Sequence, residues 1–107
     1  SFFFVAPTEY EEKLAKKQWK GDNPSMLLKL KELLSTIEDF SKENTEAVVK
    51  PWIEANGYSV GQVMNTLRLA LVGAGKGPGM YDVTEFIGRE ECIKRIDSLI
   101  ANLKPVE

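Results

Sequence analysis

The chain has 107 residues, and 43% of them are hydrophobic, which is enough for one packed domain or two very small subdomains (1–58 and 59–107) and excludes a disordered tail. The net charge of −2 gives the molecule as a whole no electrostatic attraction for a polyanion. One cysteine and no histidine exclude an intrachain disulfide, a cysteine-based zinc site and every nucleophile that needs a histidine base.

No apolar run approaches the roughly 20 residues of a membrane-spanning helix, so we expect no contact with a membrane. A lone cysteine fits a reducing compartment, and we expect a cytoplasmic protein. The chain begins on the aromatic run Phe2 to Phe4, without an initiating methionine. We therefore expect a piece of a longer protein, with a short linker before Pro7 that packs on this domain or on a neighbouring one.

The first predicted helix covers residues 8–20, with Thr8 as its N-cap and Gly21 as its stop. Its first turn carries acids, which the positive end of the helix dipole favours: Glu9, Glu11 and Glu12. Four lysines with helical spacing share one of its faces: Lys13, Lys16, Lys17 and Lys20. This face is either solvated and balanced by the acids or turned toward phosphates, and the sequence leaves both interpretations open.

Two further helices are predicted in the first half. Asn23 as N-cap and Pro24 in the first position predict a helix that ends near Phe40. Its apolar stripe has a 3.6-residue period: Leu27, Leu30, Leu33, Leu34 and Ile37. The next helix covers residues 43–56, and Pro51 inside it should kink or split it, because proline removes one intrahelical hydrogen bond.

Three helices are predicted in the second half. Ser59 and Gln62 form a capping box that opens the most regular helix, which Gly73 ends as a left-handed cap. Its apolar positions repeat with helical spacing: Val60, Val63, Met64, Leu67 and Leu71. Helices over 80–87 and 89–102 complete the chain. No segment alternates like a strand, so we predict an all-α fold, a compact bundle of about six helices.

The segment Leu67 to Gly79 stands out, because a helix is followed there by four glycines within seven residues. Glycine gives up side-chain packing and costs backbone entropy, so this density suggests that something approaches the backbone closely. The stretch 59–81 contains Arg68 and Lys76 and no acid. A P-loop and a dinucleotide fingerprint are excluded, because both need a preceding strand and a different context for the glycines.

These residues suit the recognition of an unpaired RNA loop. The planar guanidinium of Arg68 offers five donors, and Lys76 adds a flexible positive charge. Pro78, Met80 and Tyr81 give apolar surface for an unstacked base. The alternative is a plain helix–helix turn, with glycine caps and an arginine that reaches across the edge of the core. The carboxylates are scattered over helix surfaces, so no catalytic acid–base pair is predicted.

Four segments resemble the C-terminal region of bacterial glutamyl-tRNA synthetases, which are class I aminoacyl-tRNA synthetases: Leu67 to Gly73, Gly77 to Asp82, Ile87 to Glu91 and Lys94 to Ile96. That family carries a Leu-Arg-x-Ala-Leu-Thr-Gly segment, a Ser/Thr/Gly-Pro loop and a Leu-Gly-Lys-Glu step before its last helix. The resemblance covers most of the chain and is specific from about Leu67 to Leu99.

The resemblance implies a helical anticodon-binding domain. By this resemblance, Arg68 reaches an anticodon base, Gly77 and Pro78 pack against bases, and Met80 supports them. With the loop lysine Lys76, these residues make up the predicted anticodon-binding site. The chain departs from the family at Val72, where threonine is common, and at Gly77, where serine or threonine is common, so it lacks those hydroxyls.

For the longer protein, the resemblance implies a monomeric glutamate–tRNA ligase that uses ATP and Mg²⁺ and charges glutamate tRNA in the cytoplasm. The family's histidine-containing adenylation motif and its Lys-Met-Ser-Lys-Ser loop do not occur in these 107 residues. We therefore expect no catalytic residue, cofactor or metal in this part. The alternative function is a non-catalytic helical module for protein interaction or regulation.

Overall fold

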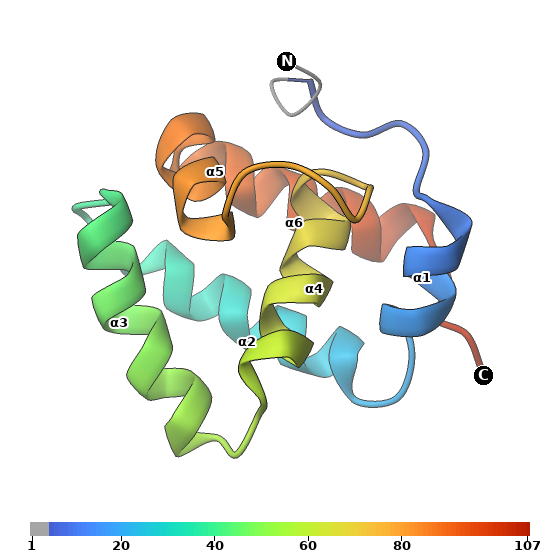
Figure 1. The fold of residues 1–107 in the computed structure, drawn as a ribbon, viewed down its shortest axis with the longest axis horizontal. Helices are drawn as coiled ribbons and strands as arrows, with labels where there is room; N and C mark the ends of the chain where they lie inside the picture. Colours follow the sequence, from blue (N-terminus) through green and yellow to red (C-terminus); the bar gives the residue numbers. More distant parts are fainter. Residues whose placement is uncertain (1–4) are drawn as a thin grey trace.

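The computed structural model describes residues 5–107, which form six α-helices joined by short connections (Figure 1). In chain order the helices are α1 (Glu12–Gln18), α2 (Asn23–Ser35), α3 (Lys42–Ala55), α4 (Val60–Leu71), α5 (Met80–Ile87) and α6 (Arg89–Asn102). No strand occurs in the described residues, and an isolated β-bridge joins Lys20 and Val106. The predicted all-α bundle is confirmed. The aromatic run Phe2 to Phe4 lies outside the described residues.

Helix α4 is the centre of the bundle, because it packs against each of the other helices (Figure 1). Its C-terminal half is buried on several sides at once, through Thr66, Leu67, Leu69, Ala70 and Leu71. The predicted apolar stripe is wrong at its first position, since Val60 is 55% exposed. Val60 lies in the first turn beside the exposed residues Ser59 and Gly61, at the edge of the bundle. The buried end of α4 is therefore the end that leads into the glycine-rich loop.

Helix α1 is shorter than predicted, and Thr8 does not cap it. Its N-cap residue is Glu11, so Glu12 alone supplies an acid to the first turn. The segment before the helix crosses the end of α4, where the Glu11 amide donates to the Gly73 carbonyl at 2.7 Å. This tertiary contact holds the preceding residues in a non-helical course, which helix propensity and capping signals do not reveal.

The C-terminal tail returns to the end of α1. Trp19, directly after α1, is 1% exposed and donates its indole N–H to the Leu103 carbonyl at 2.7 Å. The Val106 amide donates to the Trp19 carbonyl at 2.8 Å. Two segments more than 80 residues apart in sequence are therefore joined through one tryptophan.

The start of α2 is displaced by one residue from the prediction. Asp22 is the N-cap residue, and Asn23 and Pro24 are the first two residues of the helix. Asn23 is buried, and its side-chain oxygen accepts from the Gln62 amide at 2.7 Å. The Gln62 side chain thus links α4 to α2. The Ser59 hydroxyl accepts from the Gln62 backbone N–H at 3.1 Å, which is one half of the predicted capping box. The other half, from the Ser59 amide to the Gln62 side chain, is not formed among the described residues.

The predicted end of α2 near Phe40 is wrong, because the helix ends at Ser35. The Thr36 hydroxyl donates to the Leu33 carbonyl at 2.7 Å and occupies a carbonyl of the last turn. Ile37 is nevertheless only 4% exposed. The apolar pattern therefore continues past the end of the helix, which explains why periodicity placed the boundary too late.

Helix α3 runs through Pro51 as one element, so the predicted split does not occur. Proline leaves the carbonyl four residues earlier, that of Ala47, without its helical donor. Pro51 and Ala47 both lie on the exposed face of the helix, where water can satisfy that carbonyl.

Candidate nucleic-acid interface

The glycine-rich loop connects α4 to α5, and its first residue confirms the predicted left-handed cap. Gly73 has φ +78°, and its amide donates to the Arg68 carbonyl at 3.1 Å. A Cβ atom at Gly73 would lie 2.7 Å from Pro7 Cβ and 2.9 Å from the Glu9 carbonyl oxygen. The close approach that the glycines suggested is thus made, at Gly73, by the N-terminal segment of the same chain.

The Arg68 guanidinium forms two hydrogen bonds with the middle of this loop, and we call this pair of bonds the clasp. Its Nη2 donates to the Pro78 carbonyl at 2.9 Å, and its Nη1 donates to the Lys76 carbonyl at 3.4 Å. Arg68 is half-buried, and this burial lowers the pKa of its guanidinium from the ordinary value. The side chain projects from the last turns of α4, so the most enclosed helix of the bundle holds the loop in place.

The exposed part of the loop is residues 75–79, and it includes Lys76, Gly77 and Pro78. Gly77 has φ +129°, a conformation that favours glycine over a residue with a side chain. The structure therefore brings Arg68 together with three of the other predicted site residues at one surface. These groups can offer positive charge, N–H donors and an apolar proline ring to an unpaired base.

Met80 is the predicted site residue that does not lie on this surface. It is 4% exposed and belongs to the hydrophobic core, so the expectation that it offers surface to a base is wrong in this conformation. Met80 is the first residue of α5, so the loop joins this helix at a core residue. Tyr81 is half-buried, and burial, followed by the nearby Glu46 charge, raises the pKa of its phenol.

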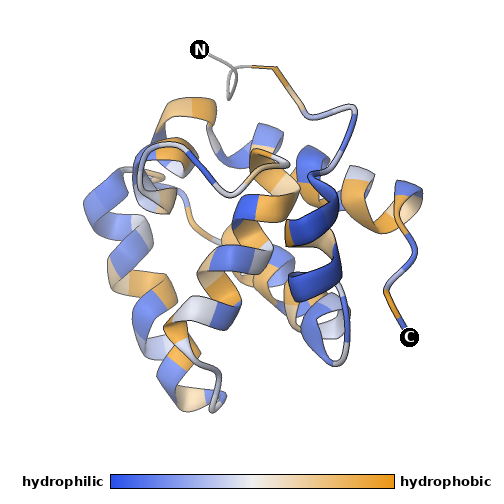
Figure 2. Cartoon of the chain, turned by 45° about the vertical axis from the view of Figure 1, so that its right-hand side comes forward, coloured by the Kyte–Doolittle hydropathy of each residue, from blue (hydrophilic) through white to orange (hydrophobic). Residues whose placement is uncertain are grey.

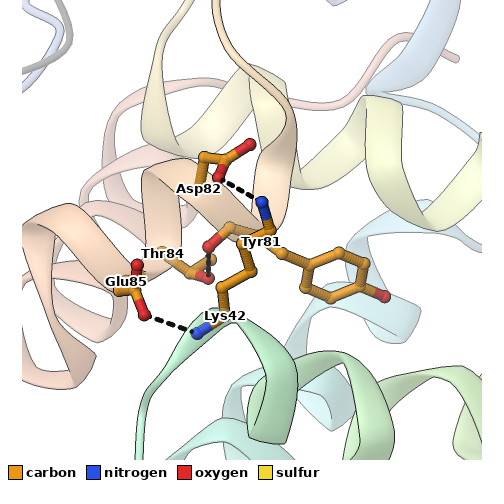
Figure 3. A network of polar contacts seen from close by, with 5 residues as sticks. All are labelled: Lys42, Tyr81, Asp82, Thr84 and Glu85. Atoms are coloured by element: carbon orange, nitrogen blue, oxygen red, sulfur yellow. Dashed lines mark hydrogen bonds and ion pairs between the residues drawn. The ribbon is translucent and has the colours of Figure 1, made fainter.

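The far end of the loop is anchored through α3 (Figure 3). Lys42 Nζ forms an ion pair with Asp82 Oδ1 at 3.0 Å, and the Lys42 backbone N–H donates to Glu85 Oε2 at 2.9 Å. The hydrogen bond to Asp82 is the main cause that raises the pKa of Lys42. Because Lys42 neutralises Asp82 at the start of α5, that carboxylate opposes less of the positive charge of Arg68 and Lys76.

Arg95 also holds the loop in place, and the sequence reasoning missed this role. It is 1% exposed, and it donates from Nη1 to the Leu71 carbonyl at 2.8 Å and from Nε to Glu91 Oε2 at 2.7 Å. Leu71 is the last residue of α4, so this buried cation caps the negative end of the helix where the loop begins. The sequence does contain a sign of this role. Arg95 lies on the same face of α6 as the apolar residues Cys92, Ile96 and Leu99, which are buried.

The described residues contain no group of three histidine, cysteine or acidic side chains that could hold a metal ion. Within residues 5–107, no helix has the length and apolar character to cross a membrane.

Comparison with known proteins assigns the chain to a class. Residues 1–100 match the family model described as the anticodon binding domain. The chain belongs to this family.

Glutamate–tRNA ligases are among the relatives of this chain. The enzyme of Phocaeicola vulgatus is 53% identical over 103 residues, and that of Parabacteroides distasonis is 54% identical over 104 residues. These matches cover 96% and 97% of this chain but 20% and 21% of the two relatives, so the chain spans about a fifth of their length. It corresponds to the anticodon-binding part of these ligases, as the resemblance implied.

Solved structures agree with this assignment. The glutamate tRNA ligase of Elizabethkingia meningosepticum, in complex with its amino acid, superposes with a TM-score of 0.89 at 41% identity. The match covers 95% of this chain and 20% of that one. The glutamate-tRNA synthetase of Elizabethkingia anophelis gives a TM-score of 0.81 at 40% identity and covers 94% of this chain and 19% of its own.

Proposed function

We propose that this chain recognises the anticodon of glutamate tRNA through Arg68 and the exposed loop residues Lys76, Gly77 and Pro78. The observation that supports this proposal most directly is the clasp between the Arg68 guanidinium and the Lys76 and Pro78 carbonyls, at 3.4 and 2.9 Å. The clasp fixes this exposed surface before RNA arrives, and the stretch 59–81 that forms it contains no acid of its own. A preformed surface loses less conformational entropy on binding than a mobile loop would.

Each group in this surface has a separate role. The N–H donors of Arg68 that do not bond to the loop carbonyls can contact a base edge, while the flat face of the guanidinium can stack on a base. Lys76 supplies charge to a phosphate, and the Pro78 ring supplies an apolar contact. Met80, from the core below, supports the loop at its junction with α5.

The activity of the longer protein is part of the same proposal. A monomeric glutamate–tRNA ligase would join glutamate to its tRNA with ATP and Mg²⁺, held by a catalytic part outside these residues, in the cytoplasm. This domain would select the tRNA and would be attached to the remainder of the synthetase.

The test is the affinity of the full-length protein for the anticodon stem-loop of glutamate tRNA, together with kcat/KM for tRNA in aminoacylation. Arg68→Ala should weaken recognition of the cognate anticodon by roughly 1–3 kcal/mol, the range for one good base contact. Arg68→Lys should recover little, because an ammonium cannot bridge two carbonyls with a planar fork.

The matched control is Lys94→Ala, which removes an exposed positive charge from α6, outside the loop. It should leave discrimination between cognate and substituted anticodons unchanged. Wild-type kcat/KM for tRNA in the Arg68→Ala protein would contradict the assigned role. An absence of anticodon-dependent binding by the wild type would contradict RNA recognition by this domain and favour a protein-interaction module.

A further inference from the structure

Helix α1 presents lysines to solvent beside the candidate interface. Its inward residues are partly or fully buried: Leu14, Ala15 and Gln18. Lys13, Lys16 and Lys17 are all exposed on the opposite side. Lys16 is bound to Glu12 by an ion pair of 2.8 Å. The side chains of Lys13 and Lys17 make no hydrogen bond or ion pair with any other residue that the structure describes, so their charges are available to a partner.

The position of α1 relative to the loop is fixed by the fold. The Glu11 amide, at the N-cap of α1, donates to the Gly73 carbonyl at the start of the loop, and α1 packs against α4. Figure 2 shows α1, mostly hydrophilic, beside α4, and the loop that joins α4 to α5 starts at the upper end of α4. The helix that carries Lys13 and Lys17 therefore begins beside the loop on which we place the unpaired bases.

An RNA strand that offers bases to the loop also carries phosphates on either side of them. The stretch 59–81 supplies only two cations, Arg68 and Lys76, and Arg68 already bonds to the loop. Lys76 can meet one phosphate, so neutralisation of the other flanking phosphates falls to other elements. Lys13 and Lys17, at i and i+4, are neighbours on one helix face, with about 6 Å between their Cβ atoms.

Glu11 lies between the loop, where we place the bases, and the α1 lysines, where we place the phosphates. Its Oε1 lies 3.7 Å from the position of a Cβ atom on Gly75, so its negative charge stands directly beside the loop. A carboxylate there repels a phosphate, which favours a base at the loop. Phosphates are then bound further along α1, at Lys13 and Lys17.

We propose that Lys13 and Lys17 bind phosphates of the RNA strand whose bases contact the 76–78 loop. This inference rests on the proposed function, because it assumes that RNA occupies the loop. It assigns to α1 affinity without sequence discrimination, since phosphate contacts position a nucleic acid and base contacts specify it.

The experiment compares two double variants of the full-length protein with the wild type. Lys13→Gln with Lys17→Gln removes the proposed contacts. Lys29→Gln with Lys94→Gln removes the same charge from exposed positions on α2 and α6, which lie behind α4 in Figure 1. Binding of a labelled anticodon stem-loop of glutamate tRNA is titrated from low to moderate KCl, with circular dichroism to confirm folding.

The Lys13/Lys17 variant should bind more weakly, and the slope of log affinity against log salt should become shallower by about 1.5, as expected for two lost phosphate contacts. Its preference for the cognate anticodon over a substituted one should stay at the wild-type ratio. The Lys29/Lys94 variant should keep the wild-type slope.

A wild-type slope in the Lys13/Lys17 variant, with binding still lost in Arg68→Ala, would overturn this inference and leave the proposed function standing. An equal loss of slope in both double variants would also overturn it, because the effect would then follow net charge alone. If the wild type shows no anticodon-dependent binding, both proposals fail together.

Discussion

Two arginines hold the glycine loop, and their burial separates their roles. Arg68 bonds to the Lys76 and Pro78 carbonyls from a half-buried position, so part of its guanidinium stays within reach of a ligand. Arg95 bonds to the Leu71 carbonyl from a site that is 1% exposed, where no ligand can reach it. The same side-chain chemistry therefore serves the proposed recognition of RNA at Arg68 and structural support at Arg95.

Arg95→Met should destabilise the domain without touching the exposed surface. The change leaves the Leu71 carbonyl without this donor and Glu91 without its partner. We expect a loss of about 3 kcal/mol, at the lower end for a broken buried pair, because Glu91 keeps some solvent contact. Urea denaturation measures this loss, with the exposed neighbour in Lys94→Met as the control. Equal midpoints for the two variants would show that Arg95 contributes nothing specific.

At the scale of elements, the loop owes its shape to contacts with three other segments. The segment before α1 covers its first glycine, α6 caps the carbonyl at the end of α4 through Arg95, and α3 holds the start of α5 through Lys42. None of these partners is a sequence neighbour of the loop. The loop is therefore a tertiary feature rather than a local turn.

Gly73→Ala should be more costly than Gly21→Ala, although both glycines have positive φ. Each change places a side chain in a left-handed conformation, at about 1–2 kcal/mol. At Gly21 nothing lies within 4 Å of the new Cβ atom, whereas at Gly73 Pro7 and the Glu9 carbonyl lie within 3 Å. Overpacking there should add about 1–3 kcal/mol. The difference between the two unfolding free energies measures this steric part, and a difference near zero would refute the close packing of the N-terminal segment.

At the scale of the whole molecule, the two ends of the described chain stabilise each other around Trp19. Removal of residues 103–107 would delete both hydrogen bonds of the tail to this residue, worth about 1 kcal/mol each. In a Trp52→Phe background, which isolates the Trp19 signal, we expect red-shifted fluorescence and a lower melting temperature. Removal of Glu107 alone is the control. Unchanged emission after the longer deletion would contradict the burial of Trp19 by the tail.

The helices that sequence predicted best are those whose boundaries are set locally. α5 and α6 occupy the predicted ranges, separated at Gly88, which has φ +87°. The boundaries of α1 and α2 were missed, because the Glu11 contact with Gly73 and the burial of Ile37 depend on distant segments. Capping signals and apolar periodicity depend on residues close in sequence, so they do not indicate such contacts.

The candidate site likewise has features that local sequence indicates and features that depend on distant contacts. The sequence alone indicated the all-α class, the most regular helix and the candidate residues Arg68, Lys76, Gly77 and Pro78, because periodicity, charge and glycine spacing are properties of neighbouring residues. The burial of Met80 and the contact of Arg95 with the end of α4 depend on tertiary packing. Tertiary packing also places the start of α1 beside the loop, and this helix carries Lys13 and Lys17, which have no side-chain partner among residues 5–107. Burial and proximity arise when segments far apart in the chain pack together, and no local pattern encodes which of them will meet.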